Sequence, residues 1–150
     1  MKKLLLILLF VAAAGCSSGA PDDELIAETL DSLEQAAQAR DVGEFMEWVS
    51  KEYADDSGND WKRIRGLAQY QFIQNRKLYL YKSIRNMDIV GDQATAIVLV
   101  AAAGEPISDP EKLTSIKAEL MRFDLELVRD KNWTVKSATW RRINASDFLL

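Results

Sequence analysis

The amino-acid sequence predicts an α+β fold, with three N-terminal helices packed on one face of a four-stranded antiparallel sheet. Between residues 23 and 75, apolar residues recur every three or four positions, as they do in helices with one buried face. From residue 78 onward the period changes to two, in four runs interrupted by turn residues. The 150 residues are enough for one domain of this kind.

Three helices are predicted in the first half of the chain. The first spans about residues 23 to 40, and its buried stripe includes Ile26 and Leu30. Asp41 is placed to cap a second helix, in which apolar residues recur at i, i+3, i+4 and i+7 up to residue 49. A polar break over residues 50 to 59 precedes the third helix, which Asp60 caps and which ends near residue 75.

Four strands are predicted in the second half. They cover residues 78–90, 93–103, 116–129 and 133–143. Gly91-Asp92 and residues 130 to 132 form the short turns, whereas residues 104 to 115, with Pro106 and Pro110, read as a loop. No element is assigned to the tail, residues 144 to 150.

Two of the strands carry information about their faces. In the third, apolar residues such as Phe123 alternate with Arg122, Asp124 and Glu126, so one face of the sheet is expected to be wet. The second strand is apolar on both faces, since Ile97 and Leu99 alternate with Val98 and similar residues. We therefore expect a loop of the chain, or another molecule, to cover its second face.

The N-terminus has the pattern of an export signal. Lys2 and Lys3 precede an apolar run over residues 4 to 14, which makes only about 16 Å of helix, too short to cross a bilayer. The following Ala13-Ala14-Gly15-Cys16 resembles the lipobox of bacterial lipoproteins, although Ala13 stands where Leu is usual. This resemblance implies that residues 1–15 are a signal peptide and that Cys16 carries the lipid. Residues 12 to 14 also fit an ordinary secretory cleavage site, which would leave a free thiol.

The lipoprotein interpretation fixes a location. Residues 16–23 would be the lipidated cysteine and a flexible tether, which holds the domain within about 25 Å of the membrane surface. The expected place is the cell envelope, with the membrane contacted through the lipid on Cys16. By the same resemblance, Ser17 instead of Asp after the cysteine favours the outer membrane, facing the periplasm, if the source is Gram-negative.

Composition excludes several chemistries. Loss of Lys2 and Lys3 lowers Lys plus Arg from 19 to 17 against 23 acidic residues, so the mature chain carries −6 and nucleic acid is not an expected partner. The chain has no histidine, which removes histidine bases and nearly all zinc sites. The acidic run from Asp55 to Asp60 lacks the alternating spacing of a calcium loop. Neither a metal nor a cofactor is expected.

Two stretches resemble the nuclear transport factor 2-like superfamily. Residues 87 to 96 (MDIVGDQATA) are similar to its hydrophobic–Gly-Asp–Ala pattern, and residues 125 to 135 (LELVRDKNWTV) are similar to its Leu-Val-to-Trp-x-Val ending. The resemblance covers about residues 24–143. It implies a cone, in which a curved sheet wraps around the helices and leaves a pocket at the open end. Aromatic residues that could line such a pocket, or simply pack the core, are Trp48, Tyr53, Trp61, Tyr70, Tyr79 and Phe123.

The resemblance transfers no catalytic residue. Enzymes of this superfamily use Asp or Tyr, often with His, whereas here a carboxylate made basic by an apolar pocket would be needed. Strand parity with Leu80 and Ile84 would point Asp88 inward, although an aspartate before a turn is usually solvated.

Three functions remain open at this point. The leading expectation is a lipid-anchored envelope module that binds a small apolar ligand or a protein partner without catalysis. The second is a histidine-independent isomerase or dehydratase that uses a buried carboxylate and a tyrosine. The third is an assembly component that dimerises, or docks on another envelope protein, through its sheet.

Overall fold

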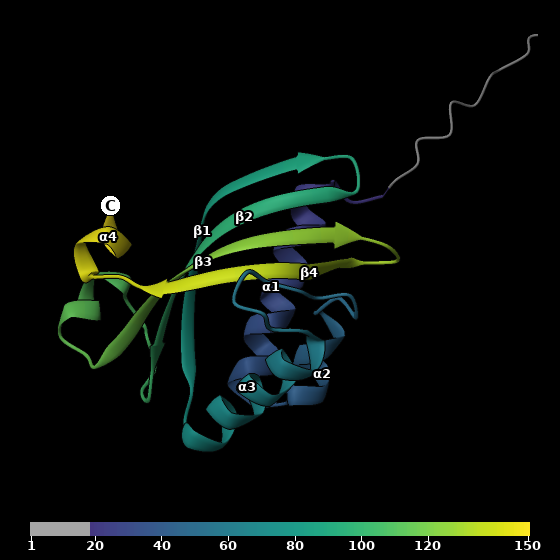
Figure 1. Cartoon of the computed structure of the whole chain (residues 1–150). Coiled ribbons are helices and arrows are strands. Elements are labelled where there is room, and N and C mark those ends of the chain that lie inside the picture. The colour runs from purple at the N-terminus through teal and green to yellow at the C-terminus, as the bar shows by residue number, and fades with distance from the viewer. Residues whose placement is uncertain (1–18) are drawn as a thin grey trace, which may run out of the picture.

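The structure is a computed structural model and describes residues 19–150, so the predicted signal peptide and Cys16 lie outside the described residues. Helices α1 (Asp22–Ala39), α2 (Val42–Glu47) and α3 (Trp61–Gln74) come first. Strands β1 (Tyr79–Val90), β2 (Gln93–Ala103), β3 (Ala118–Arg129) and β4 (Trp133–Arg142) then form one antiparallel sheet in the order of the sequence (Figure 1). The predicted α+β class and four-stranded sheet are confirmed.

The helices differ from the prediction in number. A 3₁₀ helix, η1 (Pro110–Thr114), lies in the predicted loop, and a short helix, α4 (Ala145–Leu149), forms from the tail. The described residues thus contain four α-helices, of which only α1 and α3 are long. None of the described helices is long and apolar enough to cross a membrane.

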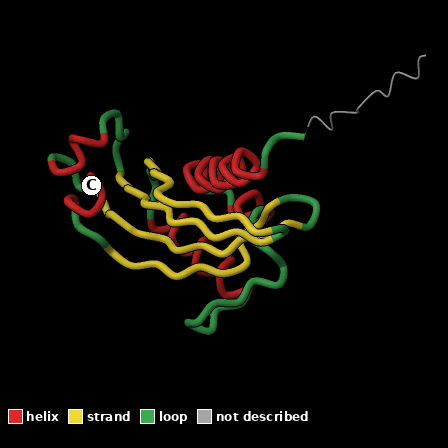
Figure 2. The backbone as a smooth tube through the Cα atoms, turned by 90° about the horizontal axis from the view of Figure 1, so that it is seen from above, coloured by secondary structure: helices red, strands yellow, loops and turns green. Residues whose placement is uncertain are grey.

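The main core lies between the sheet and the N-terminal helices. We call the sheet face that packs on α1 the inner face; Figure 2 shows the helix lying along it. From α1, Ile26 and Leu30 are buried against Ala94 and Ala96 of β2 and Leu127 of β3. The apolar stripe that the sequence predicts for the first helix is therefore the stripe that packs on the sheet.

A second core covers part of the outer face. Leu99 and Ala101 of β2 are buried there by Leu113 of η1 and Phe148 of α4. The Phe148 ring lies 6.2 Å from that of Tyr81 on β1. Segments of the chain itself therefore cover the second apolar face of β2, which was the observation behind the predicted assembly role.

The tail forms a helix whose N-terminal end is capped by side chains. Asn144 accepts a hydrogen bond from the N–H of Asp147, whose carboxylate accepts one from the N–H of Asn144. Sequence periodicity could not reveal a helix of five residues, although the Asn144 and Asp147 pair is the signature of a capping box.

A bulge in β1 places Asp88 on the outer face, in agreement with the solvated role and against the inward orientation that strand parity would give. Ile84 pairs with Val98 and Asn86 with Ile97, which leaves Arg85 as an extra residue. Asp88 consequently pairs with Thr95 on the outer face, is exposed, and accepts a hydrogen bond from the Asn86 amide at 2.8 Å. The parity argument that would point Asp88 inward is wrong, because one inserted residue moves every later side chain to the other face.

The alternation predicted for the third strand is confirmed. Leu125 and Leu127 are buried on the inner face, whereas Arg122 and Asp124 form an ion pair of 2.7 Å on the outer face. The hydrogen bond from Arg122 lowers the pKa of Asp124, so this carboxylate stays charged on the wet side of the sheet.

Candidate ligand-binding face

One row of apolar side chains crosses the whole inner face. Ile84 pairs with Val98, Val98 with Phe123, and Phe123 with Trp140, so the four residues are direct cross-strand neighbours. We call these four residues the inner row. The Phe123 and Trp140 rings have centroids 6.4 Å apart. The row continues the apolar surface that α1 and α2 cover nearer the two sheet turns.

The two ends of the inner row are open to solvent. Val98 is 3% exposed, whereas Ile84 is 37% and Trp140 is 40% exposed. Large apolar side chains on a concave, helix-facing surface are usually covered, so exposure here marks surface that a ligand or partner could bury.

The neighbouring row of the inner face has apolar residues in its middle and a cation at each end, and each cation is paired with a carboxylate. Lys82, Val100, Met121 and Arg142 pair across the four strands in the same way. Asp31 and Glu34 of α1 both pair with Lys82. Burial alone lowers the pKa of Lys82, but its hydrogen bonds to Asp31 and Glu34 and their charges outweigh that effect and raise it. Lys82 therefore stays protonated, and the carboxylates of Asp31 and Glu34 balance its positive charge.

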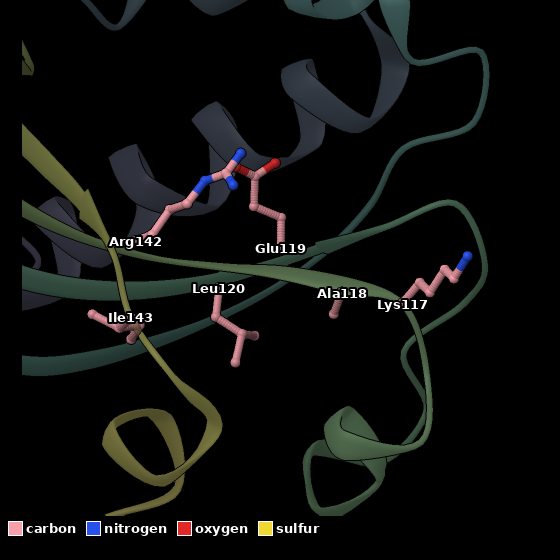
Figure 3. Close-up of a pocket in the computed structure, with 6 residues that line it drawn as sticks. All are labelled: Lys117, Ala118, Glu119, Leu120, Arg142 and Ile143. Carbon is pink, nitrogen blue, oxygen red and sulfur yellow. The ribbon is translucent and has the colours of Figure 1, made fainter.

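The far edge of this surface is also neutralised. Arg142 contacts Glu119 at 2.8 Å. Figure 3 shows these two side chains extending to one side of the strands, with Leu120 and Ile143 on the other. The open hollow that they line has a volume of about 480 Å³. Inner-face charges are thus paired, and the surface that remains suits a neutral apolar group.

The six aromatic residues predicted to line a pocket lie in separate places. Phe123 belongs to the inner row, whereas Tyr53 is 4% exposed within the core and Tyr70 is 59% exposed on α3. Tyr79 pairs with Ala103 and lies on the outer face.

The remaining two are tryptophans at helix ends. Trp48 follows α2, where its carbonyl accepts a hydrogen bond from the N–H of Val135 at 2.9 Å. Trp61 begins α3, with the Lys51 ammonium 3.7 Å from its ring centroid. Both are half-buried; the Trp61 side chain packs against the main core, whereas the contact of Trp48 with β4 is made by its backbone.

Asp55 organises the acidic loop. Its carboxylate accepts hydrogen bonds from the Tyr53 hydroxyl (2.8 Å), the Ser57 N–H (2.9 Å) and the Asn59 N–H (3.0 Å). Burial alone would raise the pKa of Asp55, but these hydrogen bonds, those from Asn59 foremost, lower it overall. Protein donors therefore occupy the oxygens that a cation would need, which agrees with the unsuitable spacing of the run.

Replacing Asp55 with alanine is expected to lower the free energy of unfolding by about 1–2 kcal/mol, because it removes several charge-assisted hydrogen bonds from a partly solvated loop. Since folding lowers the pKa of Asp55, its contribution is complete above the ordinary value of 3.8 and is lost as the pH falls through the lower folded value. Urea unfolding at pH 7 and at pH 2.5 checks this. The difference between the wild type and the variant should be smaller at pH 2.5 than at pH 7; an equal difference at both would contradict the assignment.

The sequence analysis missed Ile84, Met121 and Trp140 as candidate site residues. The sequence does show Trp140 as a large apolar residue near the end of a predicted strand, which was reason enough to consider it as a site residue. Its face could not be deduced, since a bulge in β4 leaves Lys136 unpaired between Val135 and Ser137. The parity of β4 therefore changes between Trp133 and Trp140, and both point inward.

The comparisons with known proteins identify the fold. The sequence matches no protein-family model and no curated protein. Solved structures do resemble it. A candidate scytalone dehydratase from Novosphingobium aromaticivorans superposes with a TM-score of 0.66 at 11% identity, over 81% of this chain and 84% of that one.

Two further structures are similar. A candidate dehydratase of the nuclear transport factor 2-like family from Streptomyces avermitilis gives a TM-score of 0.64 at 10% identity, over 82% of this chain and 97% of that one. Bd1075 of Bdellovibrio bacteriovorus gives 0.64 at 10% identity over 81% of this chain, which spans only 40% of Bd1075. The helices that precede a curved antiparallel sheet, and these neighbours, together show that the chain has the nuclear transport factor 2-like fold.

Proposed function

We propose that the protein is a lipid-anchored module of the cell envelope that binds a small apolar ligand on its inner row, without catalysis. The observation that carries the proposal is the exposure of Ile84 and Trp140 at the two ends of a continuous apolar row on the inner face. Covering such surface contributes roughly 25 cal/mol per Å², so an apolar molecule gains affinity there without a specific polar contact.

The start of α1 supports the proposed anchoring. Asp22, its first residue, pairs with Arg129 of β3 and accepts a hydrogen bond from the Trp133 indole at 3.3 Å. Because α1 already begins at Asp22, the tether is two residues shorter than the predicted 16–23; it would join the domain at the end of the sheet that carries both tight turns (Figure 1). In that arrangement the middle of the sheet, with the inner row, stays clear of the attachment point.

A catalytic role is the second candidate, because two neighbours are named as candidate dehydratases. It would require a carboxylate of raised pKa beside a tyrosine hydroxyl. Among the described residues, the tyrosine hydroxyl that donates to a carboxylate is that of Tyr53, to Asp55. Burial and this contact raise the pKa of Tyr53, whereas that of Asp55 is lowered. Both shifts oppose proton transfer at neutral pH, which favours the binding role.

A neutral fluorescent probe, N-phenyl-1-naphthylamine, tests the binding proposal. We expect it to bind the wild-type protein and to quench tryptophan emission. Trp140→Ala and Ile84→Ser should each weaken its binding about 5- to 30-fold, the effect of losing 1–2 kcal/mol of contact. Val90→Ser is the matched control, because Val90 is an apolar strand residue that is 80% exposed on the outer face.

Two results would contradict the proposal. One is equal probe binding by all three variants and the wild type. The other is turnover of hydroxy-ketone substrates by the purified protein, which would move the enzyme candidate to first place.

A further inference from the structure

A second concave site, away from the inner row, is basic. It is a hollow of about 520 Å³ between the C-terminal end of α1 and the connection from α3 to β1, and we call it the basic hollow. In Figure 1 this connection lies at the lower end of the sheet, where β1 begins. The lining residues are Gln38, Ala39, Arg40, Arg76, Lys77, Leu78 and Tyr79.

The three cations of the basic hollow lack protein counter-ions. Arg40, Arg76 and Lys77 form no ion pair with any residue in the described range 19–150. In the same range, Lys82 and Arg129 each pair with two carboxylates. What sets Arg40, Arg76 and Lys77 apart is that all three line one hollow, in a chain with a net charge of −4.

Helix dipoles account for only part of this charge. Both α1 and α3 end at the hollow, and each C-terminus carries roughly half a negative charge. Together they offset about one of the three positive charges, which leaves about two. The backbone of Arg40 also caps α1 directly, since its N–H donates to the carbonyls of Ala36 and Ala37. The last carbonyls of α1 are thus partly satisfied without the guanidinium group.

The other lining groups suit a small organic anion. The amide oxygen of Gln38 accepts a hydrogen bond from the N–H of Leu80 at 3.0 Å, which fixes this side chain while its NH₂ group remains a donor. Leu78 is half-buried and offers apolar surface. Guanidinium groups bind phosphate through paired hydrogen bonds, and the volume lies in the range of small-molecule sites.

We propose that the basic hollow binds the phosphate group of a small organic phosphate, with Arg40, Arg76 and Lys77 on the phosphate and with Leu78 on the carbon portion. A phospholipid headgroup offers the same chemistry, but the position of the hollow favours a free ligand. It lies at the opposite end of α1 from the tether, and the 18 residues of that helix span about 27 Å.

Titration of the purified full-length protein, in micelles of a non-ionic detergent, tests this proposal. Phenyl phosphate is added while backbone and arginine side-chain N–H signals are followed by NMR. We expect saturable shifts confined to residues 38–40 and 76–79. The double variant Arg76→Glu/Lys77→Glu should weaken binding at least tenfold, whereas Lys62→Glu/Arg63→Glu, which makes the same charge change on the exposed start of α3, should change it less than twofold.

Several outcomes would overturn the proposal. One is the absence of chemical-shift changes at millimolar phenyl phosphate. Another is equal weakening of phenyl phosphate binding by both double variants, which would mean that the anion is attracted to positive charge in general. Shifts seen only when the micelles contain phosphatidylglycerol would assign the site to lipid and reject the free ligand. Thermal unfolding of each variant shows whether any loss of binding reflects a loss of fold.

Discussion

Replacing Cys16 with serine is expected to move the protein from the membrane fraction to the soluble fraction. Serine has no thiol to receive diacylglycerol, so the chain would lack its acyl groups. Each buried methylene contributes about 0.8 kcal/mol, and one acyl chain alone binds only marginally, so stable attachment depends on the two or three chains of a bacterial lipoprotein. Cell fractionation and detergent phase separation measure the change.

Intact-mass measurement of the same samples provides the direct check. The wild-type protein should begin at a lipidated Cys16 and the variant should carry no acyl mass. Replacing Ser17 with aspartate is the companion variant in a Gram-negative host, where it should shift the protein to the inner membrane while leaving it lipidated. A wild-type protein that has a free sulfhydryl and partitions into the aqueous phase would reduce the proposal to ordinary secretion.

Most of the fold can be predicted from local sequence features, namely apolar spacing, capping residues and turn residues. Apolar spacing and capping residues place α1, α2 and α3 within a residue or two of their observed ends, because each helix buries one stripe. The pairing of β1 with β2 and of β3 with β4 follows from short turns such as Gly91-Asp92, whereas a longer segment that contains η1 joins β2 to β3. The sequence misses α4 because five residues hold too little periodicity, and Phe148 becomes buried only through contacts with distant strands.

The candidate site is harder to predict than the fold, because it depends on which face of the sheet each side chain occupies in all four strands. A bulge at Arg85 moves Asp88 to the outer face, and another at Lys136 brings Trp140 to the inner face. Nothing in the local sequence marks either bulge. The six aromatic residues were chosen by side-chain type, and type alone does not distinguish Phe123 in the inner row from Tyr53 in the core.

Replacing Trp133 with alanine is expected to lower the free energy of unfolding by about 3–5 kcal/mol, a large part of the 5–15 kcal/mol available to a domain. Trp133 is 2% exposed and joins α1 to the sheet. Its carbonyl accepts a buried hydrogen bond from the Thr29 hydroxyl at 3.1 Å, and its indole donates to Asp22. Removing the ring would leave a cavity under α1. Urea unfolding followed by far-UV circular dichroism measures the loss.

Trp140 is the matched control, because it lies on the same strand and the same face but is 40% exposed. Trp140→Ala should lower the free energy of unfolding by less than about 1 kcal/mol while it weakens probe binding, since exposed substitutions seldom disturb the core. Trp133→Phe should retain most of the stability that Trp133→Ala loses, because it keeps an aromatic ring in the core and gives up one long hydrogen bond. If Trp140→Ala destabilised the protein as much as Trp133→Ala, the inner row would belong to the core, and its exposure could no longer support a binding site.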